Sequence, residues 1–179
     1  MCSNCQLVNL VSINHNLYMR ILGIDPGFDR LGIAIIDKNE KGKESLVYSE
    51  CFETNKKDSF SERLFLIGKQ VAFCIEKYKP EYLSIEKLYM TVNQKTAMNV
   101  AEARGVVIYE SQKSNIPIYE FTPMEIKMAV TGFGKATKND VAKMVPKLIV
   151  LESKKMKDDE IDAIAIALTL SATIRYRNM

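Results

Sequence analysis

The chain has 179 residues, a mass of 20.3 kDa and a formal net charge of +3, with 47% hydrophobic and 26% charged residues. A single domain accounts for this length, since domains run to roughly 150 residues, and the composition is that of an ordinary globular protein. These values exclude a large two-domain machine and a disordered chain, and no apolar run approaches the roughly 18 residues of a membrane span. The small net charge is a weak argument for a polyanionic partner.

The first eighteen residues differ from the rest of the chain. Residues 1–18 contain no Lys, Arg, Asp or Glu, and Asn9, Asn14 and Asn16 interrupt their apolar character. A secretory signal would begin with positive charge and continue as an unbroken apolar stretch, and a transit peptide would be rich in Arg. We therefore predict a disordered or mistranslated extension followed by one domain over 19–179. Without a targeting signal, we expect a cytoplasmic protein.

The hydrophobic pattern predicts a meander of three strands, followed by helices that alternate with two further strands. The predicted strands cover 20–25, 31–37, 45–52, 82–86 and 116–121, and the predicted helices cover 59–79, 94–114, 123 to about 132, 139–149 and 159–176. Helical crossovers join the first, fourth and fifth strands, which should therefore be parallel. We predict an α/β fold with a mixed five-stranded sheet flanked by helices.

Local signals mark the ends of three predicted helices. Ser59 followed by Glu62 fits a capping box at the start of the first helix. Gly132 and Gly134 predict a flexible loop after the third. Pro146 predicts that helix 139–149 is bent or interrupted.

Four carboxylates stand where strands end or a helix begins. Asp25 ends the first strand, Glu86 ends the fourth, and Asp159 and Asp162 open the last helix. Each alone could be a turn residue, a solvated strand end or a helix-capping acid. Parallel neighbouring strands would bring Asp25 and Glu86 to the same sheet edge, where ligand sites in α/β sheets gather. Asp159 and Asp162 are three residues apart and share one helix face.

Such a cluster would hold cations. Neighbouring carboxylates raise one another's pKa unless a positive charge neutralises them. Oxygen-only ligands favour Mg²⁺ or Mn²⁺, and a pair of such ions is the usual arrangement for phosphodiester hydrolysis. The pattern therefore predicts a metal-dependent phosphodiesterase.

A basic segment precedes the last helix. Residues 127–157 contain eight Lys against one Asp and one Glu, whereas the charges of residues 20–90 cancel. A solvated lysine face would have the same composition, but beside a metal cluster the segment fits a track for a phosphate backbone. In the nearby loop, Lys135 follows the two glycines and is a candidate DNA contact. Tyr89, shortly after Glu86, is either a core residue or a platform on which a base stacks.

Four segments together resemble the RuvC family of bacterial Holliday junction resolvases. They lie between Met19 and about Thr173 and read LGIDPGFDRLGIAIID, PEYLSIEKLYMTVNQKTAMNVAEARGVVI, IKMAVTGFGKATKNDVAKMV and DDEIDAIAIAL. The resemblance implies an RNase H-like fold and a homodimeric endonuclease that nicks two opposing strands of a four-way DNA junction. It implies two Mg²⁺ ions per active site, with Mn²⁺ as a substitute, and the RuvA–RuvB branch-migration complex as a partner.

The resemblance also assigns roles to residues. The family's catalytic, metal-binding acids fall on Asp25, Glu86, Asp159 and Asp162, with Asp158 as the alternative third acid. The aromatic residue that inserts into the junction falls on Tyr89, where Phe is more usual, and the DNA-contacting lysines fall on Lys127 and Lys138. Helix 94–114 resembles the dimer contact. We expect Asp25 to bridge both ions, Glu86 and Asp162 to hold one each, and Asp159 to complete a site or orient the attacking water.

Three other interpretations remain. An RNase H-like nuclease of the YqgF type, acting on RNA, would share the first strand, but the ARG and GFGKATK segments and Tyr89 argue against it. An actin-like ATPase would need two such domains. A catalytically inactive DNA-structure binder would not need all four acids.

Overall fold

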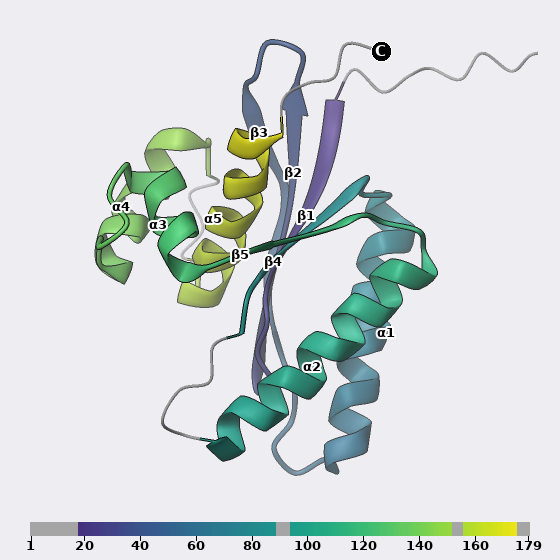
Figure 1. Cartoon of the computed structure of the whole chain (residues 1–179). Coiled ribbons are helices and arrows are strands. Elements are labelled where there is room, and N and C mark those ends of the chain that lie inside the picture. The colour runs from purple at the N-terminus through teal and green to yellow at the C-terminus, as the bar shows by residue number, and fades with distance from the viewer. Residues whose placement is uncertain (1–17, 89–93, 152–155, 175–179) are drawn as a thin grey trace, which may run out of the picture.

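The computed structural model describes residues 18–88, 94–151 and 156–174, and its centre is a five-stranded mixed sheet (Figure 1). The strands are β1 (Tyr18–Asp25), β2 (Arg30–Asn39), β3 (Glu44–Glu53), β4 (Tyr82–Glu86) and β5 (Ile118–Phe121). The helices are α1 (Phe60–Tyr78), α2 (Gln94–Lys113), α3 (Pro123–Thr131), α4 (Lys138–Leu148) and α5 (Asp158–Thr173). The strand order is β3-β2-β1-β4-β5, in which β1, β2 and β3 pair antiparallel while β4 pairs parallel with β1 and β5. The predicted α/β class and strand directions are confirmed.

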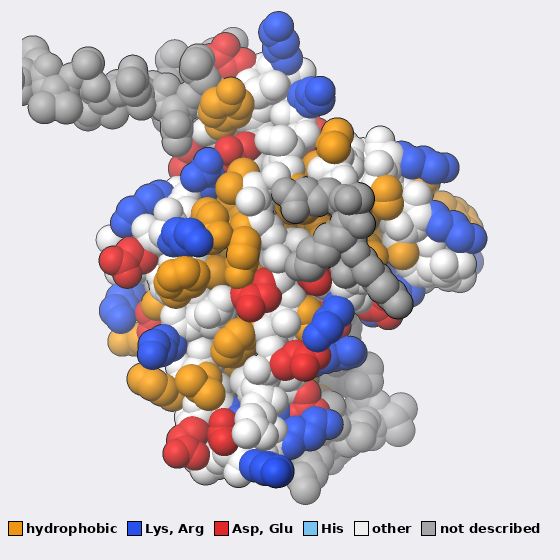
Figure 2. Space-filling model, turned by 180° about the vertical axis from the view of Figure 1, so that it is seen from behind, with side chains coloured by type: hydrophobic (Ala, Val, Ile, Leu, Met, Phe, Trp, Pro, Cys, Tyr) orange, Lys and Arg blue, Asp and Glu red, His pale blue; other side chains and the backbone are white. Residues whose placement is uncertain are grey.

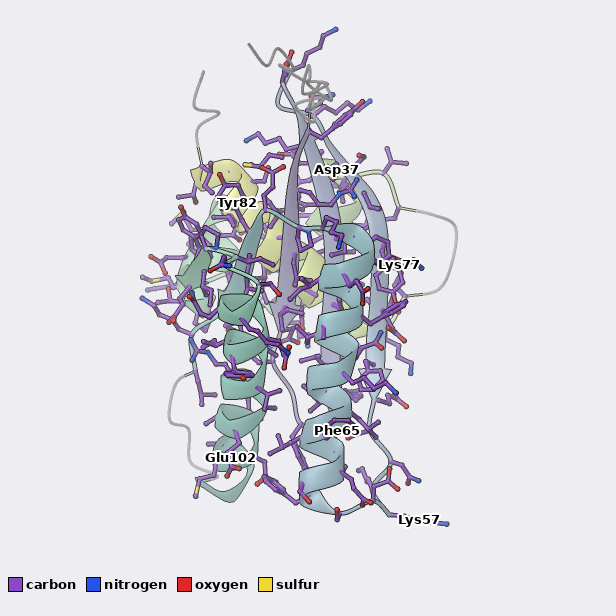
Figure 3. All side chains as sticks on the ribbon, turned by 90° about the vertical axis from the view of Figure 1, so that its right-hand side faces the viewer. Asp37, Lys57, Phe65, Lys77, Tyr82 and Glu102 are labelled. Atoms are coloured by element: carbon purple, nitrogen blue, oxygen red, sulfur yellow. The ribbon has the colours of Figure 1, made fainter. Side chains whose placement is uncertain are left out.

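Helices cover both faces of the sheet. α1 and α2 lie on one face, and α3, α4 and α5 lie on the other (Figure 1). Successive side chains of a strand point to opposite faces, so Ile21 of β1 joins the core under α5 while Leu22 and Ile24 join the core under α1 and α2. Figure 3 shows α1, with Phe65, and α2, with Glu102, side by side in front of the sheet. This two-sided burial explains why β1 has a continuous apolar sequence.

α5 lies closest to the sheet. Its residues 163–171 are all buried. A Cβ atom at Gly23 would lie only 2.3 Å from the carbonyl oxygen of Ala163, so glycine allows the helix backbone to touch β1. The Ser84 hydroxyl of β4 donates a hydrogen bond of 2.7 Å to the carbonyl oxygen of Ile166. These contacts fix the helix across the centre of the sheet.

Most predicted helix ends are confirmed, but Pro146 does not interrupt α4 as one of its two predicted effects required. The Ser59 hydroxyl accepts a hydrogen bond from the Glu62 N–H, and the Glu62 side chain accepts one from the Ser59 N–H. α4 continues through Pro146 to Leu148. A proline this close to the C-terminal end removes one intrahelical hydrogen bond and leaves the rest of the helix intact.

β1 begins at Tyr18, one residue before the predicted start of the domain at Met19. Residues 1–17, which hold nearly all of the predicted extension, lie outside the described residues. In the part of the chain that the structure describes, no helix is long and apolar enough to cross a membrane.

Candidate active site

The two strand-end acids meet at one edge of the sheet. Asp25 is the last residue of β1, and Glu86 is the last residue of β4. The parallel register pairs Ile24 with Ile85, so the next residue on each strand leaves the sheet at the same level. This is the carboxyl edge at which the sequence predicted a site.

The first turn of α5 brings the other two acids to this edge. A Cβ atom at Gly32 of β2 would lie 2.1 Å from the carbonyl oxygen of Asp159 and 3.0 Å from the Cβ of Asp25. Glycine at this position therefore lets the start of α5 sit directly on β2, beside Asp25. Asp162 lies one helical turn further on. The four acids thus come from β1, β4 and α5.

The four carboxyl groups repel one another. The pKa of Asp25 is raised to about 7, first because burial disfavours its charged form and then because of the negative charges of Asp162, Glu86 and Asp159. Burial also raises the pKa of Glu86 and that of Asp162. A site with oxygen donors only and several negative charges close together fits a hard divalent cation.

Two basic side chains already contact these acids. The Nζ of Lys138 lies 2.6 Å from Oδ2 of Asp162, and the Nε of Arg30 lies 3.4 Å from Oδ2 of Asp159. Among the described residues, no three His, Cys, Asp or Glu side chains stand close enough to form a ready metal site. A divalent ion would draw the carboxylates together and compete with these bases for them.

Of the two candidates for the third acid, Asp159 has the more suitable position. Its side chain is 13% exposed and accepts a hydrogen bond of 3.6 Å from the thiol of Cys51. Its charge acts on both Asp25 and Asp162. Asp158 is exposed and lines a recess of about 200 Å³ between α4 and α5. The geometry therefore favours Asp159 as the third acid.

The predicted DNA-contacting residues lie at different distances from the acids. Lys127 of α3 is near enough for its charge to lower the pKa of Glu86 against the effect of burial. Lys135 is exposed in the turn between α3 and α4, while Lys138 pairs with Asp162. Tyr89 lies outside the described residues. On the face seen in Figure 2, basic and acidic side chains are interspersed.

Sequence reasoning missed the contact that anchors the end of β4. Nε of Arg104, on α2, donates a hydrogen bond of 3.2 Å to the carbonyl oxygen of Glu86. The same guanidinium lies 2.9 Å from Oε2 of Glu120 on β5. Arg104 belongs to the ARG segment, but only the folded structure shows that it joins α2 to the strand ends beside the acids.

Comparisons with known proteins agree with this geometry. A family model described as "Crossover junction endodeoxyribonuclease RuvC" matches residues 21–170. A protein of that name from Petrotoga mobilis is 43% identical over 149 residues, which cover 83% of this chain and 91% of the relative. Another, from Fusobacterium nucleatum, is 40% identical over 151 residues, which cover 84% of this chain and 79% of the relative.

Solved structures lead to the same family. The structure of Thermus thermophilus RuvC in complex with a Holliday junction substrate aligns with a TM-score of 0.79 at 30% identity and covers 84% of this chain and 92% of that one. The yeast mitochondrial Holliday junction resolvase Ydc2 aligns with a TM-score of 0.66 at 17% identity, covering 86% of this chain and 78% of that one, and shows a shared fold. The predicted RNase H-like fold is thereby confirmed. The chain belongs to the crossover junction endodeoxyribonuclease RuvC family.

Proposed function

We propose that this chain resolves Holliday junctions, nicking two opposing strands of a four-way DNA junction during recombination and repair. The observation that carries the proposal is that Asp25, Glu86, Asp159 and Asp162 gather from three elements at one sheet edge. There, burial first and the charges of the other three acids second raise the pKa of Asp25 to about 7. The Thermus thermophilus relative was solved with a Holliday junction substrate, which supports the choice of substrate.

The four acids would hold the divalent cations on which nucleases of this family depend. We assign Mg²⁺ as the natural ion, two per site, with Mn²⁺ as a substitute, because all the donors are carboxylate oxygens. Bound there, the ions would supply an activated water and stabilise the leaving oxygen of the cut phosphodiester. Asp25, the acid with the most strongly raised pKa, has to lose its proton before it can bind a cation.

The basic residues around the acids would bind the DNA backbone. Lys127 lies on α3, Lys135 in the turn that follows it, and Lys138 at the start of α4. The charges of Lys127 and Lys138 act on Glu86. Each of the three lysines can neutralise one phosphate, and the salt dependence of junction binding should report these contacts. In this proposal Tyr89 stacks on a base at the opened junction centre.

Two symmetric nicks need two active sites, so we propose a homodimer. α2 is the proposed contact, and it exposes 60% of Met98 and 64% of Tyr109. The RuvA–RuvB complex is the proposed partner that delivers junctions. With chromosomal DNA as the substrate, we place the reaction in the cytoplasm.

The test is incubation of the full chain in Mg²⁺ with three labelled substrates: a synthetic four-way junction, a linear DNA duplex and a structured RNA. We expect paired, symmetric nicks in the junction alone. Cleavage of the linear duplex at a similar rate would refute the proposal, and preferential cleavage of the RNA would favour the YqgF-like alternative.

Asp25→Asn tests the site itself. The variant should bind the junction as well as the wild type, because the basic residues are unchanged, and should nick it about 10³-fold more slowly or not at all. Gel-shift and single-turnover cleavage assays measure the two properties separately. Efficient cleavage by Asp25→Asn in Mg²⁺ would remove Asp25 from the metal site.

A further inference from the structure

Lys138 is the basic residue most closely engaged with the acids. It is the first residue of α4, and a capping box between Thr137 and Asp140 fixes the turn that carries it. Its Nζ lies 2.6 Å from Oδ2 of Asp162 on α5. The pair therefore links two helices directly in front of the strand ends.

The charge of Lys138 also reaches the deeper acids. Its positive charge acts on Asp25 and on Glu86, as well as on the Asp162 carboxylate that it contacts. Lys138 is therefore a source of positive charge for all three of these acids. Like a bound metal ion, the ammonium group contacts the Asp162 carboxylate and partly neutralises the acids around it.

The Lys138 side chain is also exposed enough to move away from Asp162. Its side chain is 64% exposed, against 24% for Asp162. A recess of about 200 Å³ opens beside the pair, lined by Lys138, Asn139, Ala142, Asp158, Ile161 and Asp162. The long, flexible lysine side chain can swing into this space or into solvent without moving the backbone of α4.

We propose that Lys138 is an exchangeable counter-ion, which holds Asp162 in the metal-free protein and gives it up to the divalent ion. This inference rests on the proposed function, since it takes Asp162 as a metal ligand. A dication and an ammonium group that share one carboxylate repel each other strongly in a partly buried site. Metal binding therefore releases Lys138, and the released ammonium group binds a phosphate of the junction.

The exchange couples two binding events. The metal ion binds Asp162, and a DNA phosphate binds Lys138. Metal binding therefore frees Lys138 for the DNA, and DNA binding removes Lys138 as a competitor for Asp162. Coupling of this kind is reciprocal: the metal ion tightens junction binding by the same factor by which the junction tightens metal binding. The Asp162 carboxylate is thus paired with a cation throughout, first with Lys138 and then with the metal ion.

The test is a Mn²⁺ titration of the DNA-free full chain, in which electron paramagnetic resonance measures the free Mn²⁺ at each step. Lys138→Met should bind Mn²⁺ about threefold to tenfold more tightly than the wild type, as expected when a partly exposed ion pair no longer competes. Lys138→Arg, which keeps the pair, should stay within about twofold of the wild type. The matched control is Lys147→Met on the same helix, about 13 Å away along its axis. At physiological salt this distance exceeds a Debye length of about 8 Å, so the control should change the affinity less than about twofold.

A double-mutant cycle separates exchange from simple repulsion. In an Asp162→Asn background, which weakens Mn²⁺ binding, Lys138→Met should raise the affinity less than about twofold, because the lysine has lost its partner. An unchanged affinity in Lys138→Met, an equal gain in Lys147→Met, or the same gain in both backgrounds would each overturn the exchange. Any of these results with a wild type that nicks junctions refutes this inference alone, whereas a wild type that nicks no junction refutes the proposed function.

Discussion

Gly32→Ala should damage the active site although it replaces none of the four acids. The new Cβ atom would lie 2.1 Å from the carbonyl oxygen of Asp159, whereas real Cβ contacts are at least 3.0 Å. The clashing atom belongs to the backbone of α5, so the helix start has to move by about 0.9 Å away from β2. Displacing catalytic groups by about 1 Å costs about 10²-fold in rate, and we expect a loss of that size in cleavage of the junction.

The same overpacking should cost about 1–3 kcal/mol of stability. For a chain of this size that corresponds to a melting temperature lower by about 3–10 °C. The assay is single-turnover cleavage at a temperature well below the melting transition, with junction affinity measured in parallel. Gly68→Ala is the control, because its Cβ would meet side-chain atoms alone, the Cγ1 of Val106 at 3.0 Å and the Cγ of Glu110 at 4.0 Å, on the other face of the sheet. Gly32→Ala cleavage within threefold of the wild type would show that the close approach of α5 to β2 does not position the acids.

Three further predictions test individual groups. Without metal, the pKa of Asp25 is about 7 in the folded protein and 3.8, its ordinary value, in the unfolded chain. Between these two pH values the unfolded chain loses the proton while the folded protein keeps it, so the folded protein becomes less stable as the pH rises. Asp25→Asn should therefore melt at a higher temperature than the wild type in EDTA, by a margin that grows up to pH 7 and then stays constant; equal melting temperatures at pH 8 would contradict this. Asp159→Asn should lower the cleavage rate at least about 10²-fold and Asp158→Asn less than about threefold, and the reverse order would exchange their roles. Arg104→Gln should lose about 1–2 kcal/mol of stability, measured by urea unfolding, and cut more slowly because the end of β4 that carries Glu86 is less constrained; an unchanged rate would limit Arg104 to a structural role.

The sequence predicted the arrangement of the backbone because each element has its own periodicity. β1 and β4 are short apolar runs, α1 repeats at helical spacing, and the crossover rule makes β1 and β4 parallel. Once those two strands are parallel neighbours, Asp25 and Glu86 have to meet. The position of the acids therefore follows from strand direction and residue order alone.

The side-chain contacts around the acids could not be predicted in the same way. The pairing of Lys138 with Asp162 depends on how α4 packs against α5, and the hydrogen bond from Arg104 to Glu86 depends on the path of α2 across the sheet. Neither has a fixed sequence spacing, because long side chains select their partners only after the helices have packed. Pro146 gave a misleading signal for a related reason, since the cost of a proline depends on where the helix ends.

The dependence of the sheet on α5 has a consequence for protein synthesis. α5 follows every strand in the chain, yet it covers the centre of one sheet face and carries two of the four acids. A ribosome-bound chain that has emerged only as far as β5 holds Asp25 and Glu86 but leaves the apolar surface under α5 open to water. Such a nascent chain exposes apolar surface and holds two of the four proposed acids. In the proposed site, the helix that completes the hydrophobic core also supplies the last two acids, so we expect a partly synthesised chain not to cut DNA.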